Sequence, residues 1–488
     1  MKKNVLWLTM DHVTFHHYRH TNGARPILDT YEYLCSKGTE FTNCKSVHPL
    51  CGPCRATMLT GRYTHKHKNY RNEDGLADQS VPLINEYLEK GGYRMGFFGK
   101  NHSGYEDLKS RGIDCINFSD FGPEENRIHE EYGNPYMTPE YRAYLDRNNI
   151  DSVIYHQEWG ANIFRCLPNQ DYDLTKVNNF NAFSCGTLEP ERTHEVDFLI
   201  DEAKRWLVKN KENPFVLRLD TWGPHQAYQV PAEFADKYVN EKDIELPPSF
   251  NMDISDRSTF TQEFLRNTKE NILINNEEEW RHVLKRAYEN YSYIDMRLGE
   301  LIRWLEEEGL GDSTAILLTA DHGDSIGTKG GMFDKSGDMQ EELMEVPMVV
   351  YAPWLKGGVK NSGLVSNLDV VPTILDLLDL PVPEEMDGIS LKGVIEGSVP
   401  ERELLMCEHY GHSEFYYSQR TLYYNGYKYT TTENNPDQLF HISEDPHEMN
   451  NLINKPEMTE LLTVMREKLK MEQERVGDNQ PFYQVDCR

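Results

Sequence analysis

The most informative stretch of this chain reads Cys51-Gly52-Pro53-Cys54-Arg55, followed by Met58-Leu59-Thr60-Gly61-Arg62. Two cysteines with two residues between them are typical of a dithiol that exchanges with disulfides. The same residues also form a Cys-x-Pro-x-Arg pattern followed by Thr-Gly-Arg. In this pattern only the first of the two cysteines is required. The flanks favour this second interpretation, because a redox dithiol normally follows a tryptophan and this one follows Pro49-Leu50. A CGPC thiol-disulfide oxidoreductase remains the alternative from another class.

Length and charge limit what the chain can be. Its 488 residues, of which 38% are hydrophobic, are enough for one large domain with a sizeable core and a smaller second unit. The net charge of −29 argues against binding to nucleic acid or to an anionic membrane, because both need a basic surface. A small anionic substrate in a local basic pocket is compatible with this charge, and so is an oligomer.

Cysteine usage and the N-terminal residues predict a cytoplasmic protein. The nine cysteines are irregularly spaced, which is a poor disulfide framework and suits a reducing compartment. The first apolar run is too short for the core of a signal peptide and leads directly into Asp11. No stretch is long enough to span a bilayer. We therefore expect a cytoplasmic location, unless a leader has been trimmed from this sequence.

Short apolar runs alternate with helical patterns along most of the chain. Strands are predicted at 5–10, 95–98, 215–219, 314–319 and 347–351, and helices at 27–37, 197–210, 280–308 and 369–380. This alternation predicts an α/β fold with a large, mostly parallel central sheet flanked by helices. Ligands of such sheets bind beyond the carboxyl ends of the strands. The chain places Asp11, Lys100, His225 and Asp321 directly after predicted strands.

We expect a catalytic domain at residues 1–397 and a C-terminal subdomain at residues 398–488. The composition changes near residues 397–402, and tyrosines and threonines at 416–432 predict a small antiparallel sheet. Residues 458–474 predict a closing helix. The polar, aromatic segment at about 105–191 is expected to form loops of an insertion over the active site.

Six motifs stand in a fixed order along the chain, namely Asn4–Trp7 leading to Asp11, Cys51–Arg62, Gly99-Lys100-Asn101-His102, Pro224-His225, Thr319–Asp324 and Lys335. Together they resemble the motifs of the sulfatases of the alkaline phosphatase superfamily. Further markers near the C-terminus are Asp369–Thr373, Tyr427–Tyr429 and Leu439–Glu448. One motif alone is weak, but their order and spacing carry a resemblance that covers nearly the whole chain.

The resemblance implies hydrolysis of a sulfate monoester, with a small sulfated carbohydrate as the expected substrate. It implies that a maturation enzyme converts Cys51 to Cα-formylglycine, whose hydrate is the nucleophile. One divalent cation is also implied, Ca²⁺ by preference with Mn²⁺ or Mg²⁺ as alternatives, since carboxylate oxygens suit hard cations. The metal-site residues would be Asp11, His12, Cys51, Asp321 and His322.

The catalytic residues implied by the same resemblance are Cys51, Arg55, Lys100, His102, His225 and Lys335. Arg55 and Lys100 would hold the hydrate, one hydroxyl of which attacks sulfur. His225 and Lys335 would assist departure of the alcohol. His102 would then deprotonate the second hydroxyl, so that sulfate leaves and the aldehyde returns. Independently of the family, a sulfate ester needs such positive groups because its oxygens repel a nucleophile.

Two residues depart from the family pattern and leave alternatives open. His12 stands where many sulfatases have a second acid. Three roles are open for it: a metal ligand, a residue behind the ligands or a contact to the substrate. His322 stands where asparagine is common. His12, His16 and His20 are four residues apart, so a zinc-binding helix face is another interpretation. A phosphonate monoester or phosphodiester hydrolase of the same superfamily is the closest alternative enzyme, and a binding protein with a decayed site is a third alternative.

Overall fold

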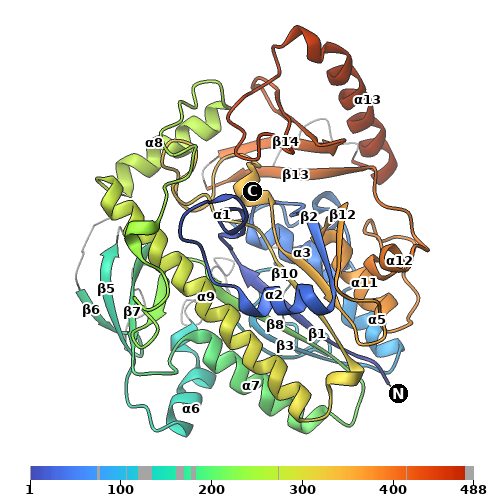
Figure 1. The fold of residues 1–488 in the computed structure, drawn as a ribbon. Helices are drawn as coiled ribbons and strands as arrows, with labels where there is room; N and C mark the ends of the chain where they lie inside the picture. Colours follow the sequence, from blue (N-terminus) through green and yellow to red (C-terminus); the bar gives the residue numbers. More distant parts are fainter. Residues whose placement is uncertain are drawn as a thin grey trace.

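An eight-stranded sheet runs through the middle of the molecule, in the order β12-β2-β11-β10-β1-β8-β3-β4 (Figure 1). The computed structural model describes residues 2–73, 77–105, 107–118, 135–160, 170–176, 183–272, 274–413 and 415–478. The strands of this sheet are β1 (Asn4–Asp11), β2 (Thr39–Lys45), β3 (Arg94–Lys100), β4 (Asp114–Phe118), β8 (Phe215–Pro224), β10 (Thr314–Ala320), β11 (Met348–Tyr351) and β12 (Val359–Ser366). The central strands β1, β8 and β10 are buried along almost their whole length, as expected for a sheet covered on both faces.

Helices cover both faces of the central sheet. On one face α2, α7 and α9 pack together, and on the other α3, α5 and α11 do so (Figure 1). These helices are α2 (Asp29–Lys37), α3 (Cys51–Thr60), α5 (Ile84–Lys90), α7 (Glu195–Asn210), α9 (Glu277–Glu307) and α11 (Val370–Leu377). Peripheral helices are α1 (Phe15–His20), α4 (Thr64–His67), α6 (Pro139–Arg147), α8 (Thr259–Asn271), α10 (Glu341–Met344), α12 (Leu391–Glu396) and α13 (Thr459–Val476). The predicted α/β class is confirmed. In the described ranges, no helix is both long and apolar enough to cross a membrane.

One strand of the central sheet runs against the others. The run predicted as a strand at 347–351 forms β11, which is antiparallel to both of its neighbours, β10 and β2. The remaining neighbouring pairs are parallel. The apolar pattern of a short strand carries no information about its direction, so the sequence predicted the strand and not its orientation.

The segment at 105–191 contains regular structure where loops were expected. Its strands β5 (Ile154–Gly160), β6 (Gln170–Asp173) and β7 (Ser184–Glu189) join β9 (Tyr228–Pro231) in a separate four-stranded sheet. Helix α6 precedes that sheet. The expectation of loops is therefore wrong for these stretches, whose polar, half-exposed strands give only weak periodicity. Residues 106, 119–134, 161–169 and 177–182 of the predicted insertion lie outside the described residues.

The C-terminal part is an antiparallel sheet closed by a helix, as predicted. Its strands are β13 (Leu404–His412), β14 (Phe415–Tyr424), β15 (Tyr427–Thr432) and β16 (Gln438–Phe440). Helix α13 packs Leu462, Met465 and Leu469 against the side chains of this sheet, such as Leu422 and Leu439. The division of the chain into domains at residue 397 remains a proposal.

We expect Leu317→Ala to lower the free energy of unfolding strongly, because Leu317 lies in the buried layer beneath the carboxyl ends of the strands. Leu317 is fully buried in β10, between β1 and β11. Truncation leaves a cavity in the core, so we expect a loss of about 2–5 kcal/mol in the free energy of unfolding, measured by urea denaturation. The control is Met471→Ala, whose side chain lies on the surface of α13 and is 67% exposed. Equal destabilisation by the two changes would contradict the prediction.

Candidate active site

Four neighbouring strands bring polar side chains together at one edge of the central sheet. Asp11 ends β1 and Lys100 ends β3, while Asp321 directly follows β10 and His225 directly follows β8. Strand β1 lies between β8 and β10, and its register with β10 aligns the ends of the two strands. The residues that follow predicted strands in the sequence are therefore adjacent in space, where α/β sheets form their sites.

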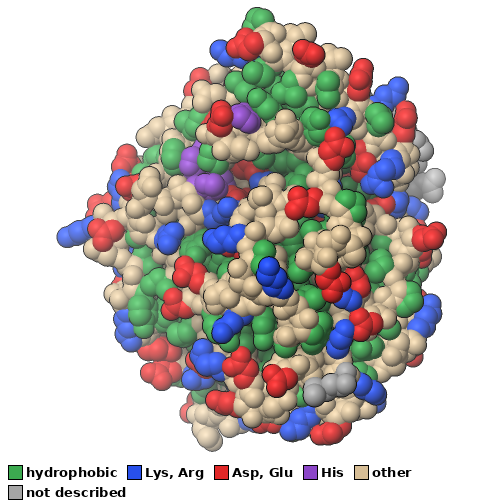
Figure 2. All heavy atoms as spheres, turned by 45° about the vertical axis from the view of Figure 1, so that its right-hand side comes forward, with side chains coloured by type: hydrophobic (Ala, Val, Ile, Leu, Met, Phe, Trp, Pro, Cys, Tyr) green, Lys and Arg blue, Asp and Glu red, His purple; other side chains and the backbone are tan. Residues whose placement is uncertain are grey.

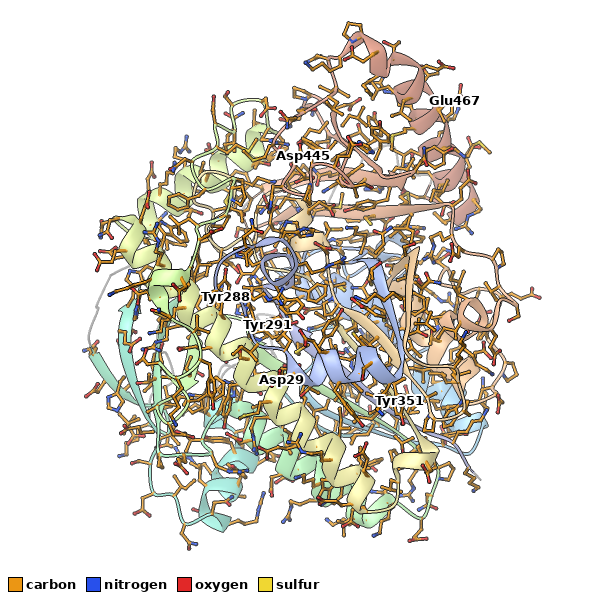
Figure 3. All side chains as sticks on the ribbon, viewed as in Figure 1. Asp29, Tyr288, Tyr291, Tyr351, Asp445 and Glu467 are labelled. Atoms are coloured by element: carbon orange, nitrogen blue, oxygen red, sulfur yellow. The ribbon has the colours of Figure 1, made fainter. Side chains whose placement is uncertain are left out.

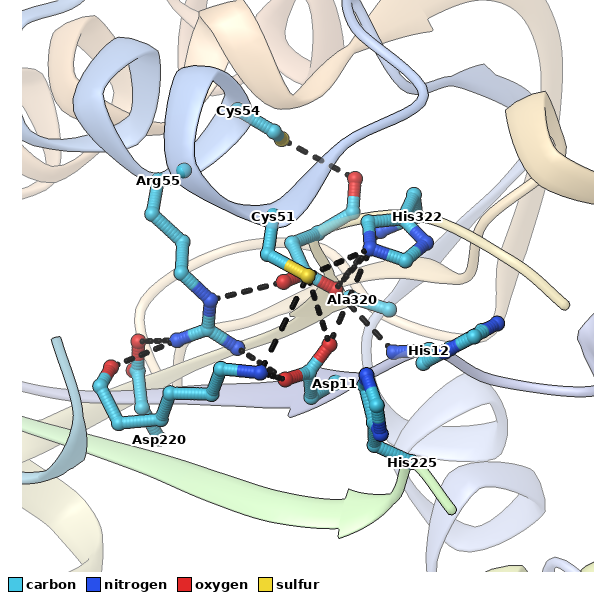
Figure 4. A network of polar contacts seen from close by, with 12 residues as sticks. Asp11, His12, Cys51, Cys54, Arg55, Asp220, His225, Ala320 and His322 are labelled. Atoms are coloured by element: carbon cyan, nitrogen blue, oxygen red, sulfur yellow. Dashed lines mark hydrogen bonds and ion pairs between the residues drawn. The ribbon is translucent and has the colours of Figure 1, made fainter. Parts of the chain in front are cut away.

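Cys51 lies at the centre of this cluster (Figure 4). It is the first residue of α3 and is completely buried. Its Sγ is 3.0 Å from Nε2 of His322, 3.7 Å from Oδ1 of Asp11 and 3.9 Å from Nζ of Lys100. The first turn of a helix offers backbone N–H groups that lack helical partners and favours negative charge. The position of Cys51 therefore suits a group that carries or develops negative charge.

Cys54 points away from Cys51 (Figure 4). Its thiol donates to the carbonyl oxygen of Asp321 at 3.0 Å and accepts from Nδ2 of Asn367 at 2.8 Å. Burial raises the pKa of Cys54 well above its ordinary value, so it remains a thiol at neutral pH. In the described part of the chain the cysteines are all free of disulfides. This geometry does not support the dithiol interpretation.

Arg55 holds three carboxylates together one helical turn after Cys51. Its Nε donates to Asp321 at 2.7 Å and its Nη1 to Asp220 at 2.8 Å, while Nη2 lies 3.6 Å from Asp11. All four of these charged side chains are 0% exposed. Burial opposes the charge of Arg55, but the three carboxylates outweigh it and raise the pKa of the guanidinium. Arg55 therefore stabilises a concentration of buried negative charge that would be very costly without a partner.

Sequence analysis missed Asp220 and Arg218, which support Arg55 from within β8. Arg218 donates to the two carboxylate oxygens of Asp220 at 2.8 and 2.5 Å. Its guanidinium also lies 4.0 Å from the ring centre of Trp7 and 4.7 Å from that of Phe97. The available signal was a pair of opposite charges two residues apart in an apolar strand, which places both on one face of the sheet.

Four side chains form a group that could hold a metal ion. Their ligand atoms all lie within 4.8 Å of one another, and the group consists of Asp11, Cys51, Asp321 and His322. Nδ1 of His322 bonds to the carbonyl oxygen of Gly323 at 2.8 Å, which makes Nδ1 the donor and leaves Nε2 as an acceptor facing Cys51. Two carboxylates, one imidazole and the group at position 51 suit a divalent cation.

Asp11 is kept ionised by its positive neighbours. Burial alone would raise its pKa, but Lys100 and then Arg55 hold that pKa well below its ordinary value. Lys100 forms a close ion pair with Asp11, and its ammonium also lies 4.8 Å from the ring centre of Trp222. The carboxylate is therefore available as a metal ligand at neutral pH.

The imidazole of His12 lies outside this four-residue group. Its Nε2 is 3.3 Å from Asp324 and its Nδ1 is 3.5 Å from Asp334, and with His225 and Asp334 it forms a separate group. Its backbone N–H donates to Asp321 of the first group at 3.2 Å, and its ring centroid lies 4.9 Å from that of His322. His12 has a φ of +61°, so the chain turns sharply after β1 and the side chain leaves the direction of the strand. The geometry favours a role beside the metal ligands over ligation of the same ion.

His225 and Lys335 form a pair suited to proton transfer. Nζ of Lys335 is 3.0 Å from Nε2 of His225 and 3.0 Å from Asp334, and Nδ1 of His225 bonds to the carbonyl of Gln226. Burial, reinforced by Lys335 and Lys100, lowers the pKa of His225 well below its ordinary value. Burial opposes the charge of Lys335, but Asp334 outweighs it and raises the pKa of the ammonium. A charged lysine therefore faces a neutral imidazole.

His102 borders the site from the end of β3. It is buried, and its φ of +45° places it in a turn. Its carbonyl oxygen packs against the residue after the cysteine, because a Cβ added to Gly52 would lie 3.1 Å from that oxygen. The predicted role of His102 as a base remains a prediction.

The negative net charge does not extend into the site. Basic side chains are buried in and around the site, namely Arg55, Lys100, Arg218 and Lys335. On the outside, Figure 2 shows acidic and basic side chains mixed over one face of the molecule. The separate sheet borders the site near Lys335, because Phe333 contacts Trp159 of β5 and Tyr228 of β9. The carboxylates of Asp11, Asp220, Asp321 and Asp334 balance these four charges, so a net positive charge facing a small anion would require a bound cation.

Comparison with known families identifies the class of protein. Residues 3–380 match the family model described as Sulfatase, and residues 328–475 match the one described as N-sulphoglucosamine sulphohydrolase, C-terminal. The first match covers well over half of the chain. The chain therefore belongs to the sulfatase family and is a sulfuric ester hydrolase.

Individual relatives are distant but match along most of their length. A choline-sulfatase of Rhizobium meliloti is 26% identical over 435 residues, covering 87% of this chain and 77% of that protein. An N-acetylglucosamine-6-O-sulfatase of Bacteroides thetaiotaomicron is 24% identical, covering 92% and 82%. Among solved structures, a phosphonate monoester hydrolase from Silicibacter pomeroyi superposes with a TM-score of 0.76 at 19% identity, covering 97% and 96%. This last likeness shows the common fold.

We expect Asp220→Asn to lower the free energy of unfolding strongly, because it removes a carboxylate from the buried ion cluster. The change leaves Arg55 and Arg218 charged and buried with one carboxylate fewer, so we expect a loss of about 3–5 kcal/mol in the free energy of unfolding. Thermal and urea denaturation measure this loss. The control is Asp379→Asn, which removes an ion pair with Lys3 from a carboxylate that is 59% exposed. That control should cost less than about 1 kcal/mol, and a similar cost for both variants would refute the argument.

Proposed function

We propose that this sulfatase hydrolyses the sulfate monoester of a small carbohydrate, with a nucleophile derived from Cys51 and one divalent cation. One observation carries the proposal. The buried sulfur of Cys51 lies 3.0–3.9 Å from His322, Asp11 and Lys100, at the N-terminus of α3. A nucleophile, a metal site and a positive charge thus meet at one point.

Conversion of Cys51 to Cα-formylglycine by a maturation enzyme fits this position. The hydrate of that aldehyde supplies a hydroxyl group as the nucleophile. Lys100, 3.9 Å from the sulfur, is placed to donate a hydrogen bond to an oxygen at this position. Besides the role in holding the hydrate that the family resemblance implies, we propose a second role for Arg55, because it contacts Asp11 and Asp321. It is a positioning residue that fixes the orientation of those two carboxylates.

Asp11, Asp321 and His322 would hold the divalent cation. Ca²⁺ is the first choice because the set is dominated by carboxylate oxygens, and Mn²⁺ or Mg²⁺ are the alternatives. The ion supplies positive charge against the sulfate oxygens and lowers the pKa of a hydroxyl bound to it. The fixed tautomer of His322 and the low pKa of Asp11 prepare both side chains for ligation.

Protonation of the leaving alcohol falls to Lys335 and His225. The ammonium of Lys335 carries the proton, and Nε2 of His225, 3.0 Å away, accepts from it and orients it towards the departing oxygen. Asp334 keeps the lysine charged and oriented. His102, next to the first turn of α3, is proposed as the base that regenerates the nucleophile.

The substrate class rests on the relatives. The N-acetylglucosamine-6-O-sulfatase relative and the C-terminal family model both support a sulfated amino sugar. The choline-sulfatase relative makes choline sulfate the main competitor in a substrate panel. A phosphonate monoester hydrolase is the second candidate function, because a solved enzyme of that name has a TM-score of 0.76.

A side-by-side assay tests the reaction. We expect faster hydrolysis of a nitrophenyl sulfate than of a phenylphosphonate ester, in protein whose Cys51 peptide has the mass of the aldehyde. Cys51→Ala should lower kcat/KM by about 10³-fold or more, because it removes the nucleophile. Cys54→Ala is the matched control and should retain most of the activity. A faster phosphonate reaction, or equal losses in the two variants, would overturn the proposal.

Metal removal should abolish activity reversibly. After treatment with a chelator we expect no hydrolysis of the sulfate ester, and recovery when Ca²⁺ is added. Ca²⁺ at about 100 times its Kd should also raise the free energy of unfolding by about 2.7 kcal/mol, visible as a higher Tm. Full activity in demonstrably metal-free protein would contradict a metal-dependent mechanism.

A further inference from the structure

A second group of metal-ligand side chains lies outside the active site, where α1 meets the C-terminal part of the chain. It consists of His16 and His20 of α1, Glu342 of α10, Glu345 and His447. In Figure 3, Asp445, two residues before His447, lies in a loop above α1. Three segments that are distant in the sequence thus contribute side chains to one small volume.

The histidines of the predicted zinc-binding helix face divide between two places. Helix α1 begins at Phe15, so His12 is not part of it and belongs to the active site. His16 and His20 are both on α1, with ring centroids 4.4 Å apart. The interpretation of His12, His16 and His20 as one helix face is therefore wrong, because the helix starts too late. His447 from the C-terminal part supplies the additional imidazole instead.

His16 is oriented by a carboxylate behind it. Its Nδ1 lies 2.7 Å from Oε2 of Glu345, and Nε2 of His20 approaches the same oxygen at 2.9 Å. Oε2 of Glu345 accepts a hydrogen bond from the Nδ1–H of His16, which leaves Nε2 as the atom with the lone pair. Carboxylate–histidine pairs of this kind orient metal ligands in proteins.

The unprotonated ring nitrogen of His16 faces a ring nitrogen of His447, at a distance typical of two ligands of one metal ion. Nε2 of His16 and Nδ1 of His447 are 3.3 Å apart. Two nitrogens bound to tetrahedral Zn²⁺ at about 2.0–2.1 Å each are separated by about 3.3–3.4 Å. Both imidazoles are therefore suited to ligate a cation.

Glu342 adds a carboxylate to the two imidazoles. Its ligand oxygen lies within 4.8 Å of the nitrogens of His16 and His447. The side chain is fully buried, and Lys329 lies 3.4 Å from Oε1. Within the described residues, Oε2 has no hydrogen-bond donor. Such an orphaned buried oxygen costs free energy, which a bound cation would recover.

A small cavity lies beside the two histidine ligands, and Glu342 is not among the residues that line it. It has a volume of about 20 Å³ and is bordered by His16, His20 and His447. That volume is enough for one water molecule. A fourth ligand can therefore come from solvent.

We propose that His16, His447 and Glu342 bind one Zn²⁺, with a water as the fourth ligand and with Glu345 and His20 behind His16. Two imidazoles and one carboxylate suit zinc, whereas the oxygen-rich active site suits calcium. The zinc ties α1, which closely follows Asp11 and His12, to the C-terminal part of the chain. Its role is structural, because it holds the segment next to the active site in place.

Zinc binding by matched variants tests the proposal. The full-length protein is stripped with a chelator and titrated with Zn²⁺ in excess Ca²⁺, by calorimetry and by metal analysis after gel filtration. Zinc bound at the active site is recognised because it persists in variants of the proposed ligands and is weakened in Asp321→Asn. We expect one Zn²⁺ per chain in the wild type, and an affinity about 10–100-fold lower in Glu345→Gln. Glu342→Gln and His447→Gln, which remove ligands, should lose the bound zinc.

The control variant is His441→Gln, from the same loop. His441 stacks on Tyr427 and pairs with Glu444, away from the proposed ligands, and should bind zinc like the wild type. Asp321→Asn should also keep this zinc, which separates the site from the catalytic metal. Circular dichroism confirms that each variant is folded. Unchanged zinc affinity in folded Glu342→Gln and His447→Gln would overturn the proposal and leave a hydrogen bond between the two imidazoles.

Discussion

The buried ion cluster around Arg55 is the constraint on which the rest of the site depends. Asp11, Asp220 and Asp321 contact this guanidinium from near the ends of three adjacent strands, and Arg218 donates to Asp220 from within β8. None of these side chains has access to water, so each charge needs its partners in place. Helix α3 is thereby fixed over the strand ends, and Cys51 at its first position is fixed with it.

The residues of this cluster hold the site in place, whereas other residues are placed to take part in the reaction. Arg55 and Lys100 share the charge balance of Asp11, and Lys100 and His322 both face Cys51. Lys335 and His225 lie in a second polar group with Asp334, so the groups suited to proton transfer are kept apart from the metal ligands. The buried cations of the site balance its carboxylates, so a divalent cation bound there would supply the net positive charge that an anionic ester needs.

Much of the architecture was predictable because it follows from local pattern. Buried strands such as Asn4–Asp11 and Thr314–Ala320 are apolar runs, and the residues directly after them lie at one edge of a parallel sheet. The direction of β11 was not predictable, since it depends on pairing with strands far away in the chain. The sheet formed by β5, β6, β7 and β9 was missed because its strands are short and polar.

The sequence by itself determined the family motifs, the class of fold and the residues that gather at the ends of the strands. Order along the chain and the period of the apolar residues carry that information. Only the tertiary structure decided which partners those residues have. It turned the imidazole of His12 towards Asp324 and Asp334, placed Asp220 under Arg55, and brought His447 to His16 across 431 positions of the chain. Contacts of that kind are set by the packing of distant segments, which no local pattern encodes.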